Sequence, residues 1–141
     1  MDQDGIVAQV PGADKLVNWF GHWPSFHDAE VINLELNRVG RSRVNLHTFA
    51  TISELDNRGR YRTDKHTLVS FLLENISSMQ LDGFNDQNVI SMLGVNKTED
   101  GFELVLGGCY GVEGCIWCTR LSVECEPGIP TQSIYPNSME N

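Results

Sequence analysis

Hydrophobic and polar residues alternate along most of this chain, which is the period-2 pattern of half-buried β-strands. The clearest example begins at Glu30, after which Ile32, Leu34 and Leu36 share one face of the predicted strand. The same parity places Asp28 and Glu30 on that apolar face. The sequence therefore predicts that two carboxylates lie at the start of this strand, beside its hydrophobic face.

Six further segments carry strand patterns, which gives about seven strands in all. They are residues 43–52, 66–73, 76–81, 88–95, 102–106 and 115–125. Residues 66–73 are apolar on both faces and predict a central strand that is covered above and below. Asp100-Gly101 is the strongest hairpin signal, because this dipeptide suits a type I′ turn.

One short helix is predicted before the first strand. Pro11-Gly12 opens it, Leu16 and Phe20 lie four residues apart on one face, and Gly21 ends it. Residues 1–10 lack a cap or sustained periodicity and are expected to be loose.

The elements together predict an α+β fold that is mainly antiparallel β. About seven strands form a meander-like sheet or two packed sheets, with one short N-terminal helix. Residues 53–66 are expected to be an exposed loop or hairpin tip, and residues 131–141 a polar tail. A chain of 141 residues suits a single domain, residues 1–141, with an ordered core of about residues 11–128.

The charge is acidic and unevenly distributed. The net charge is -9, with -5 in residues 1–37, +4 in residues 38–65 and -8 in residues 66–141. Nucleic acids and anionic membranes present phosphate, so this charge argues against both and favours a basic partner.

The chain shows no sign of export. No apolar run approaches the roughly 20 residues that span a bilayer, and the N-terminus is acidic where a signal peptide is basic. We therefore expect a cytoplasmic protein with reduced cysteines. Cys115 and Cys118 have the spacing of a metal or redox pair, but on one strand they point to opposite faces, so we expect packing roles and no cofactor.

The residues richest in chemistry are Trp23, His27, Asp28 and Glu30. A carboxylate beside an imidazole can bind a divalent ion or share a proton. However, His27 and Asp28 face opposite ways in an extended chain, and no second cluster lies at motif spacing. We favour a structural role in which the two carboxylates accept hydrogen bonds or pair with an arginine at the helix-to-strand junction.

Other polar and aromatic residues have simpler interpretations. His47 and His66 lie among apolar residues and are expected to be partly buried and hydrogen-bonded. The basic cluster of residues 58–65 is expected to be a solvated loop. Four dense aromatics are predicted to be core, with one left as an interface anchor: Trp19, Phe20, Trp23 and Phe26.

Several segments carry a family resemblance. They read F-G-H-W-P-S-F-H-D-A-E-V, V-N-L-H-T-F, K-H-T-L-V, G-F-N-D-Q-N-V and C-Y-G-V-E-G. Together they resemble the bacterial immunity protein 50 family over about residues 19–128. The resemblance implies a cytoplasmic antidote of a polymorphic toxin system that binds a cognate toxin, and it supplies no catalytic residues.

The residues themselves leave three functions open. A stoichiometric toxin inhibitor would use contact area and charge complementarity. A small enzyme or metal- or ligand-binding domain would centre on His27, Asp28 and Glu30, and a ligand-binding module without a toxin partner is the third. For the inhibitor, the expected contact residues are turn or strand-end carboxylates: Asp82, Asp86, Glu99, Asp100 and Glu113.

Overall fold

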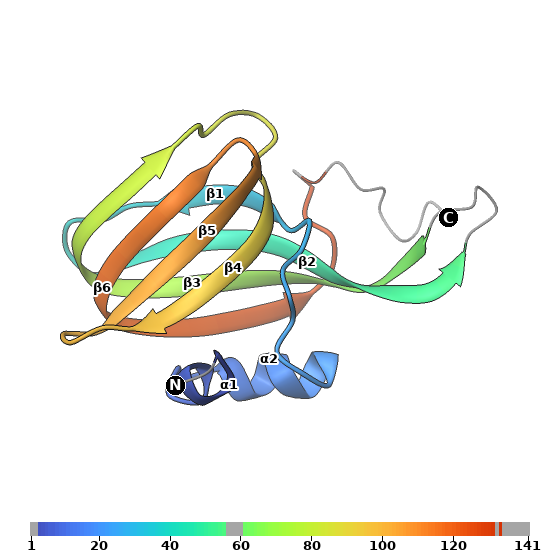
Figure 1. The fold of residues 1–141 in the computed structure, drawn as a ribbon, viewed down its shortest axis with the longest axis horizontal. Helices are drawn as coiled ribbons and strands as arrows, with labels where there is room; N and C mark the ends of the chain where they lie inside the picture. Colours follow the sequence, from blue (N-terminus) through green and yellow to red (C-terminus); the bar gives the residue numbers. More distant parts are fainter. Residues whose placement is uncertain (1–2, 56–60, 132, 134–141) are drawn as a thin grey trace.

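Six antiparallel strands and two short helices make up the described part of the protein in a computed structural model (Figure 1). The structure describes residues 3–55, 61–131 and 133, with the side chains of residues 51–63 left out. The elements are α1 (Gln3–Val7), α2 (Ala13–Phe20), β1 (Glu30–Glu35), β2 (Arg41–Leu55), β3 (Tyr61–Asp82), β4 (Val89–Lys97), β5 (Phe102–Tyr110) and β6 (Glu113–Pro127).

The strands close into a barrel in the order β1-β2-β3-β6-β5-β4. The closing seam between β1 and β4 is narrow, since the two strands are in register at Glu30 and Val89 alone among the described residues. Farther along β4, the side chain of Gln3 donates to the Val95 carbonyl and accepts from its N–H. Helix α1 therefore takes the place of a strand partner for this part of β4.

The mainly antiparallel β prediction is confirmed, but the count of seven strands is wrong for the described chain. Residues 76–81 do not form a strand of their own, because they continue the 22-residue β3. Asn75 has a positive φ of 57°, and the register shifts between Ile76 and Ser78, so the polar break is a bulge and not a turn. The strands form one closed barrel where an open meander or two packed sheets were expected.

Helix α2 begins and ends where the sequence predicts. Gly21 adopts φ 85° and its N–H donates to the Val17 carbonyl, which is the expected left-handed cap. Leu16 and Phe20 are buried against the strands. No helix among the described residues is long and apolar enough to cross a membrane.

The expectation of a loose N-terminal segment is wrong for residues 3–10. Ile6, Val7 and Val10 are buried in the core, although so short a segment shows no periodicity. The connection to α2 is held by a hydrogen bond from the Val123 N–H to the Pro11 carbonyl. At Gly12 a Cβ would lie 1.9 Å from the Val123 carbonyl oxygen, so only glycine allows this close approach.

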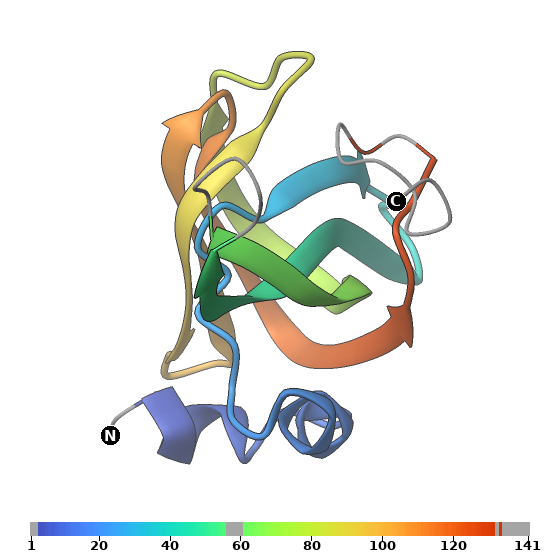
Figure 2. The same cartoon turned by 90° about the vertical axis from the view of Figure 1, so that its right-hand side faces the viewer.

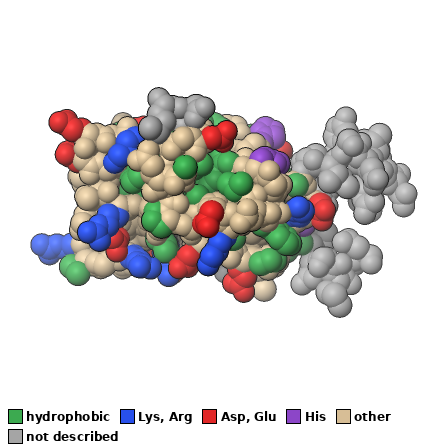
Figure 3. Space-filling model, turned by 90° about the horizontal axis from the view of Figure 1, so that it is seen from below, with side chains coloured by type: hydrophobic (Ala, Val, Ile, Leu, Met, Phe, Trp, Pro, Cys, Tyr) green, Lys and Arg blue, Asp and Glu red, His purple; other side chains and the backbone are tan. Residues whose placement is uncertain are grey.

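Both helices pack against one side of the barrel, below the strands in Figures 1 and 2. Seen from the helix side, hydrophobic side chains gather near the centre of this face (Figure 3). An apolar groove of about 660 Å³ runs between the helices there, lined by residues that include Val7, Pro11 and Val17.

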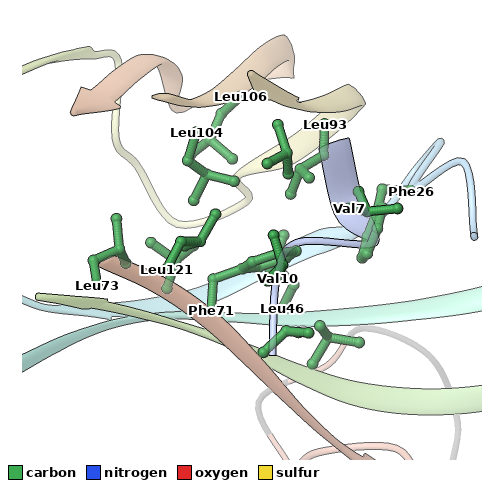
Figure 4. Packing of buried hydrophobic residues seen from close by; sticks show 14 of the residues in the cluster. Val7, Val10, Phe26, Leu46, Phe71, Leu73, Leu93, Leu104, Leu106 and Leu121 are labelled. Atoms are coloured by element: carbon green, nitrogen blue, oxygen red, sulfur yellow. The ribbon is translucent and has the colours of Figure 1, made fainter. Parts of the chain in front are cut away.

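The core fills the barrel and the space between barrel and helices. Figure 4 shows core side chains of β3, β5 and β6 gathered between the strands: Phe71, Leu73, Leu104, Leu106 and Leu121. A bulge at Ile32 resets the parity of β1, so that Val31 and Leu34 face the core. The prediction of one apolar face through Leu36 is therefore wrong, and Leu36 is 47% exposed.

Candidate functional site

The segment from Trp23 to Glu30 does not run as an extended strand. Phe26 and Asp28 both adopt left-handed backbone conformations, with φ 60° and 65°. The Trp23 ring packs against Phe26 and Phe71 at centroid distances of 5.6 and 6.3 Å. Because the chain turns twice here, the parity that placed Asp28 on the face of Glu30 does not hold.

His27 and Asp28 form a surface pair. Their closest side-chain atoms, Nε2 and Oδ2, are 3.6 Å apart, and both side chains are at least half exposed. The Nδ1 atom of His27 lies 3.0 Å from the Ser91 carbonyl, to which it donates. Exposed ion pairs of this kind contribute little to stability, so the pair fastens the segment to β4 mainly through its hydrogen bond.

Glu30 is buried at 3% exposure, and its partner is a histidine where an arginine was considered. It shares register with His47 on the face of the sheet opposite the core. The Nδ1 atom of His47 lies 2.7 Å from Glu30 Oε1, and the Ser133 hydroxyl donates to the same oxygen. The structure therefore separates Glu30 from His27 and Asp28.

His66 extends this pair into a chain that we call the glutamate–histidine relay: Glu30, His47 and His66. The Nε2 atom of His47 lies 2.9 Å from Nδ1 of His66, and the two rings stack at 5.1 Å. Since the Nδ1–H of His47 donates to Glu30, a single proton lies between Nε2 of His47 and Nδ1 of His66. Burial and the neighbouring His47 lower the pKa of His66, while Asp64 and Glu30 act in the opposite direction.

The relay is a sequestered group and not an open site. His47 is fully buried, and Phe49 lies against both imidazole rings. The chain after β6 crosses nearby, because the Gly128 N–H donates to the His66 carbonyl. Within the part of the chain that the structure describes, Glu30 and His47 are therefore closed off from solvent, while His66 is half-buried.

Cys115 and Cys118 lie on opposite faces of β6, as the strand pattern predicts, and Cys118 is buried in the core. Cys109 is exposed, so a packing role is wrong for that cysteine. Burial raises the pKa of the Cys118 thiol to about 11, so it stays protonated. Within the described residues, no group of three or more His, Cys, Asp or Glu side chains is arranged to hold a metal ion.

The predicted basic loop falls partly outside the described residues. Arg58, Arg60 and the side chain of Arg62 are not described. Lys65 is described, and its ammonium donates to the Trp19 carbonyl while lying 5.6 Å from the Trp19 ring centroid. Trp19 is 39% exposed, and its indole N–H donates to Thr67, so it ties α2 to β3.

A second candidate site is formed by two connections at one end of the barrel, at the top of Figure 1. We call residues 82–88, which lead from β3 to β4, and residues 110–113, between β5 and β6, the end platform. Two of its residues are aromatic and exposed, with Phe84 at 56% and Tyr110 at 61%. Three of the predicted contact carboxylates lie here and are exposed: Asp82, Asp86 and Glu113.

Asn88 holds the end platform together. Its side-chain oxygen accepts hydrogen bonds from the N–H groups of Asn85 and Val112, one in each connection. Its own carbonyl accepts from the Val31 N–H of β1. Asn88 is 4% exposed with φ 48°, a backbone conformation that asparagine tolerates. Its side chain joins the two connections, and its backbone carbonyl adds β1 as a third segment.

The two connections also touch directly. A Cβ on Gly83 would lie 2.6 Å from the Gly111 carbonyl oxygen, and a Cβ on Gly111 would lie 2.6 Å from Asn88 Oδ1. Both glycines have positive φ. The backbones can approach this closely only because neither position has a side chain.

The remaining predicted contact residues lie elsewhere. Glu99 and Asp100 occupy the β4–β5 turn, at the lower left of Figure 1. The nine residues of β4 separate this turn from the end platform, which is roughly 25 Å along an extended strand. The five carboxylates that the sequence groups together therefore form two separate sets.

Sequence reasoning did not single out Phe84, Asn88 or Tyr110. The available signal was the pair of segments G-F-N-D-Q-N-V and C-Y-G-V-E-G, which meet at the end platform. The segment W-P-S-F-H-D-A-E-V reaches the same place through the bond from Val31 to Asn88.

Comparison with known families identifies a relationship for most of the chain. The sequence model of a family described as Immunity protein 50 matches residues 12–126. No match was found among curated proteins or among solved structures.

Proposed function

Because the chain belongs to the immunity protein 50 family, we propose that it neutralises a cognate toxin by binding it in a stoichiometric, non-catalytic complex. Family membership implies a toxin partner in general. We further propose that the end platform is the main contact surface.

The observation that carries this proposal is the exposure of two aromatic side chains on a fixed loop pair. Phe84 and Tyr110 are more than half exposed, yet they lie on connections that Asn88 and the close glycines hold in place. Large aromatic residues supply much of the binding energy in protein interfaces. A loop pair that is already ordered loses little conformational entropy on binding, which supports tight association.

The charge around these aromatics favours a basic partner. Asp82, Asp86 and Glu113 are exposed beside Phe84 and Tyr110. They belong to the segment of residues 66–141, whose net charge is -8. Acidic groups at the rim of an interface steer a basic protein and disfavour acidic ones.

The competing enzyme or metal-site function finds less support. It required His27, Asp28 and Glu30 to converge, but Glu30 bonds to His47 and is buried, whereas His27 and Asp28 lie at the surface. An active site needs a concave pocket with convergent polar groups. We therefore retain toxin binding as the function.

The test uses the cognate toxin domain, carrying an inactivating substitution. Calorimetric titration should give one-to-one binding, and Phe84→Ala and Tyr110→Ala should each weaken it by about 2 kcal/mol, or roughly thirtyfold. Val39→Ala is the matched control, because Val39 is 87% exposed on the distant β1–β2 turn. Tight binding that survives both aromatic substitutions would move the contact surface elsewhere. Failure to bind any such toxin would refute the function itself.

A further inference from the structure

A pocket of about 430 Å³ lies between the α1–α2 connection and the strands β3 and β6. We propose that this pocket binds a small organic anion with an apolar body. The site is separate from the end platform, and nothing in the proposed toxin binding requires it.

The floor of the pocket is apolar. Leu72, Phe102 and Leu121 line it and are 3 to 8% exposed. Pro11 forms part of the wall, and its position is fixed by the hydrogen bond from Val123. The volume lies within the range of about 300–1,000 Å³ that is usual for small-molecule sites.

The mouth of the pocket is cationic. Arg41 and Arg120 both line it and lie on either side of Glu74. Their nearest nitrogen atoms are 3.5 and 3.7 Å from the two carboxylate oxygens. These distances exceed those of N–H···O hydrogen bonds, and within the described residues neither guanidinium donates a hydrogen bond. The donors of two arginines therefore remain available beside one carboxylate.

A third cation adds to this charge. The Lys97 ammonium lies 4.6 Å from the ring centroid of Phe102, which lines the pocket. Lys97 does not line the pocket and donates to the Gly101 carbonyl, but with Arg120 it makes up the lysines and arginines of residues 66–141, and its contact with Phe102 brings its charge near the site. On a protein with a net charge of -9, such a local concentration of cations over an apolar floor attracts an anion that also has apolar surface.

The ligand chemistry follows from these groups. A guanidinium binds a planar carboxylate in a bidentate geometry, and it also binds phosphate. The apolar floor accepts an aromatic or branched aliphatic body. A free organic carboxylate and the C-terminal carboxylate of a peptide share this chemistry.

The test is an NMR titration with 2-naphthoate, alongside the neutral 2-naphthamide as a matched probe. 2-Naphthoate should bind saturably and shift the backbone amides of residues near Arg41, Glu74 and Arg120. The amide should bind at least about tenfold more weakly, because it lacks the charge that the arginines recognise. An acetylated peptide that ends in Phe, compared with its C-terminal amide, distinguishes a peptide source from a free acid.

Substitutions complete the test. Arg41→Gln and Arg120→Gln should each weaken 2-naphthoate binding by roughly tenfold. Arg38→Gln removes the same charge from the neighbouring β1–β2 turn and should leave binding unchanged. Both arginines of the pocket are more than half exposed, so the folded state should tolerate their replacement. Equal affinity for acid and amide, or shifts confined to the groove between α1 and α2, would overturn the proposal.

Discussion

The end platform and the glutamate–histidine relay differ in the exposure of their polar side chains. The platform exposes Asp82, Asp86 and Glu113 at strand ends and in a loop, and it buries the amide side chain of Asn88 that orders them. The relay buries a carboxylate and an imidazole and covers them with Phe49 and Ser133. A buried charge must have its own protein partners, whereas an exposed one is free to meet another molecule.

The relay also lies where the barrel closes between β1 and β4. Glu30 pairs in register with His47 on one side and with Val89 on the other, so it stands at the seam where the barrel closes. Three backbone hydrogen bonds flank this pair, from Asp28 to Ile90, from Ile90 to Ala29 and from Val31 to Asn88, so a disturbance at Glu30 acts directly on the closure of the barrel. We therefore expect the relay to act in stability, and the proposed contact surface remains the end platform.

The largest expected effect separates these roles. Glu30→Ala should lower the free energy of unfolding by about 3 kcal/mol, because it removes the buried carboxylate that accepts hydrogen bonds from His47 and Ser133. Glu30→Gln should cost less, since its side-chain oxygen can still accept that bond. Urea unfolding followed by tryptophan fluorescence measures both.

Glu35→Ala provides the control, because it removes an exposed carboxylate from the far end of the same strand. It should change the free energy of unfolding by less than about 0.5 kcal/mol. Folded Glu30→Gln should keep its affinity for the toxin. A stable Glu30→Ala protein that has lost toxin binding would reverse our assignment.

Local signals predicted the parts of the fold that depend on local chemistry. Gly21 marked the end of α2, and the turn at residues 98–101 closes with a hydrogen bond from the Thr98 N–H to the Gly101 carbonyl. The bulge at Ile32 and the burial of α1 depend on distant strands. No periodicity within these short segments contains that information.

In the candidate site, too, local signals predicted some features, whereas others depend on distant parts of the chain. Turn positions correctly suggested exposed carboxylates. However, no local signal assigns Asp82 and Glu99 to different ends of a barrel. Phe26 and Asp28 adopt left-handed conformations that favour glycine or asparagine, so an extended strand was the natural prediction there. The resulting turn sends Glu30 to His47 and leaves His27 at the surface.

A tenfold effect on association rate should distinguish the two acidic sets. Asp82→Lys with Asp86→Lys should slow toxin association by roughly tenfold, because rim charges act mainly on the association rate. Glu99→Lys with Asp100→Lys changes the net charge equally but acts from the other end of β4. At 0.15 M salt the Debye length is about 8 Å, so the distant pair should have little effect. Stopped-flow mixing at several salt concentrations measures both variants.

Equal slowing by the two pairs would mean that overall charge, and not the end platform, steers the toxin. Slowing by Glu99→Lys with Asp100→Lys alone would place the contact at the β4–β5 turn. In either case the dissociation rate should change much less than the association rate if these carboxylates lie at the rim.

The smallest effect concerns His66 and the pH dependence of stability. Burial and His47 lower the pKa of His66 below its ordinary value of 6.5, so the unfolded chain binds a proton more readily than the folded one. The stability that follows is fully present above pH 6.5 and is lost as the pH falls below it through the folded-state pKa.

His66→Gln should therefore flatten the decline in melting temperature between about pH 7 and pH 5. His22→Gln, an exposed histidine outside the relay, should leave that decline as it is in the unmodified protein. If the two variants follow the same pH profile, protonation of His66 is not linked to folding, and the relay stabilises the barrel through Glu30 and His47 alone.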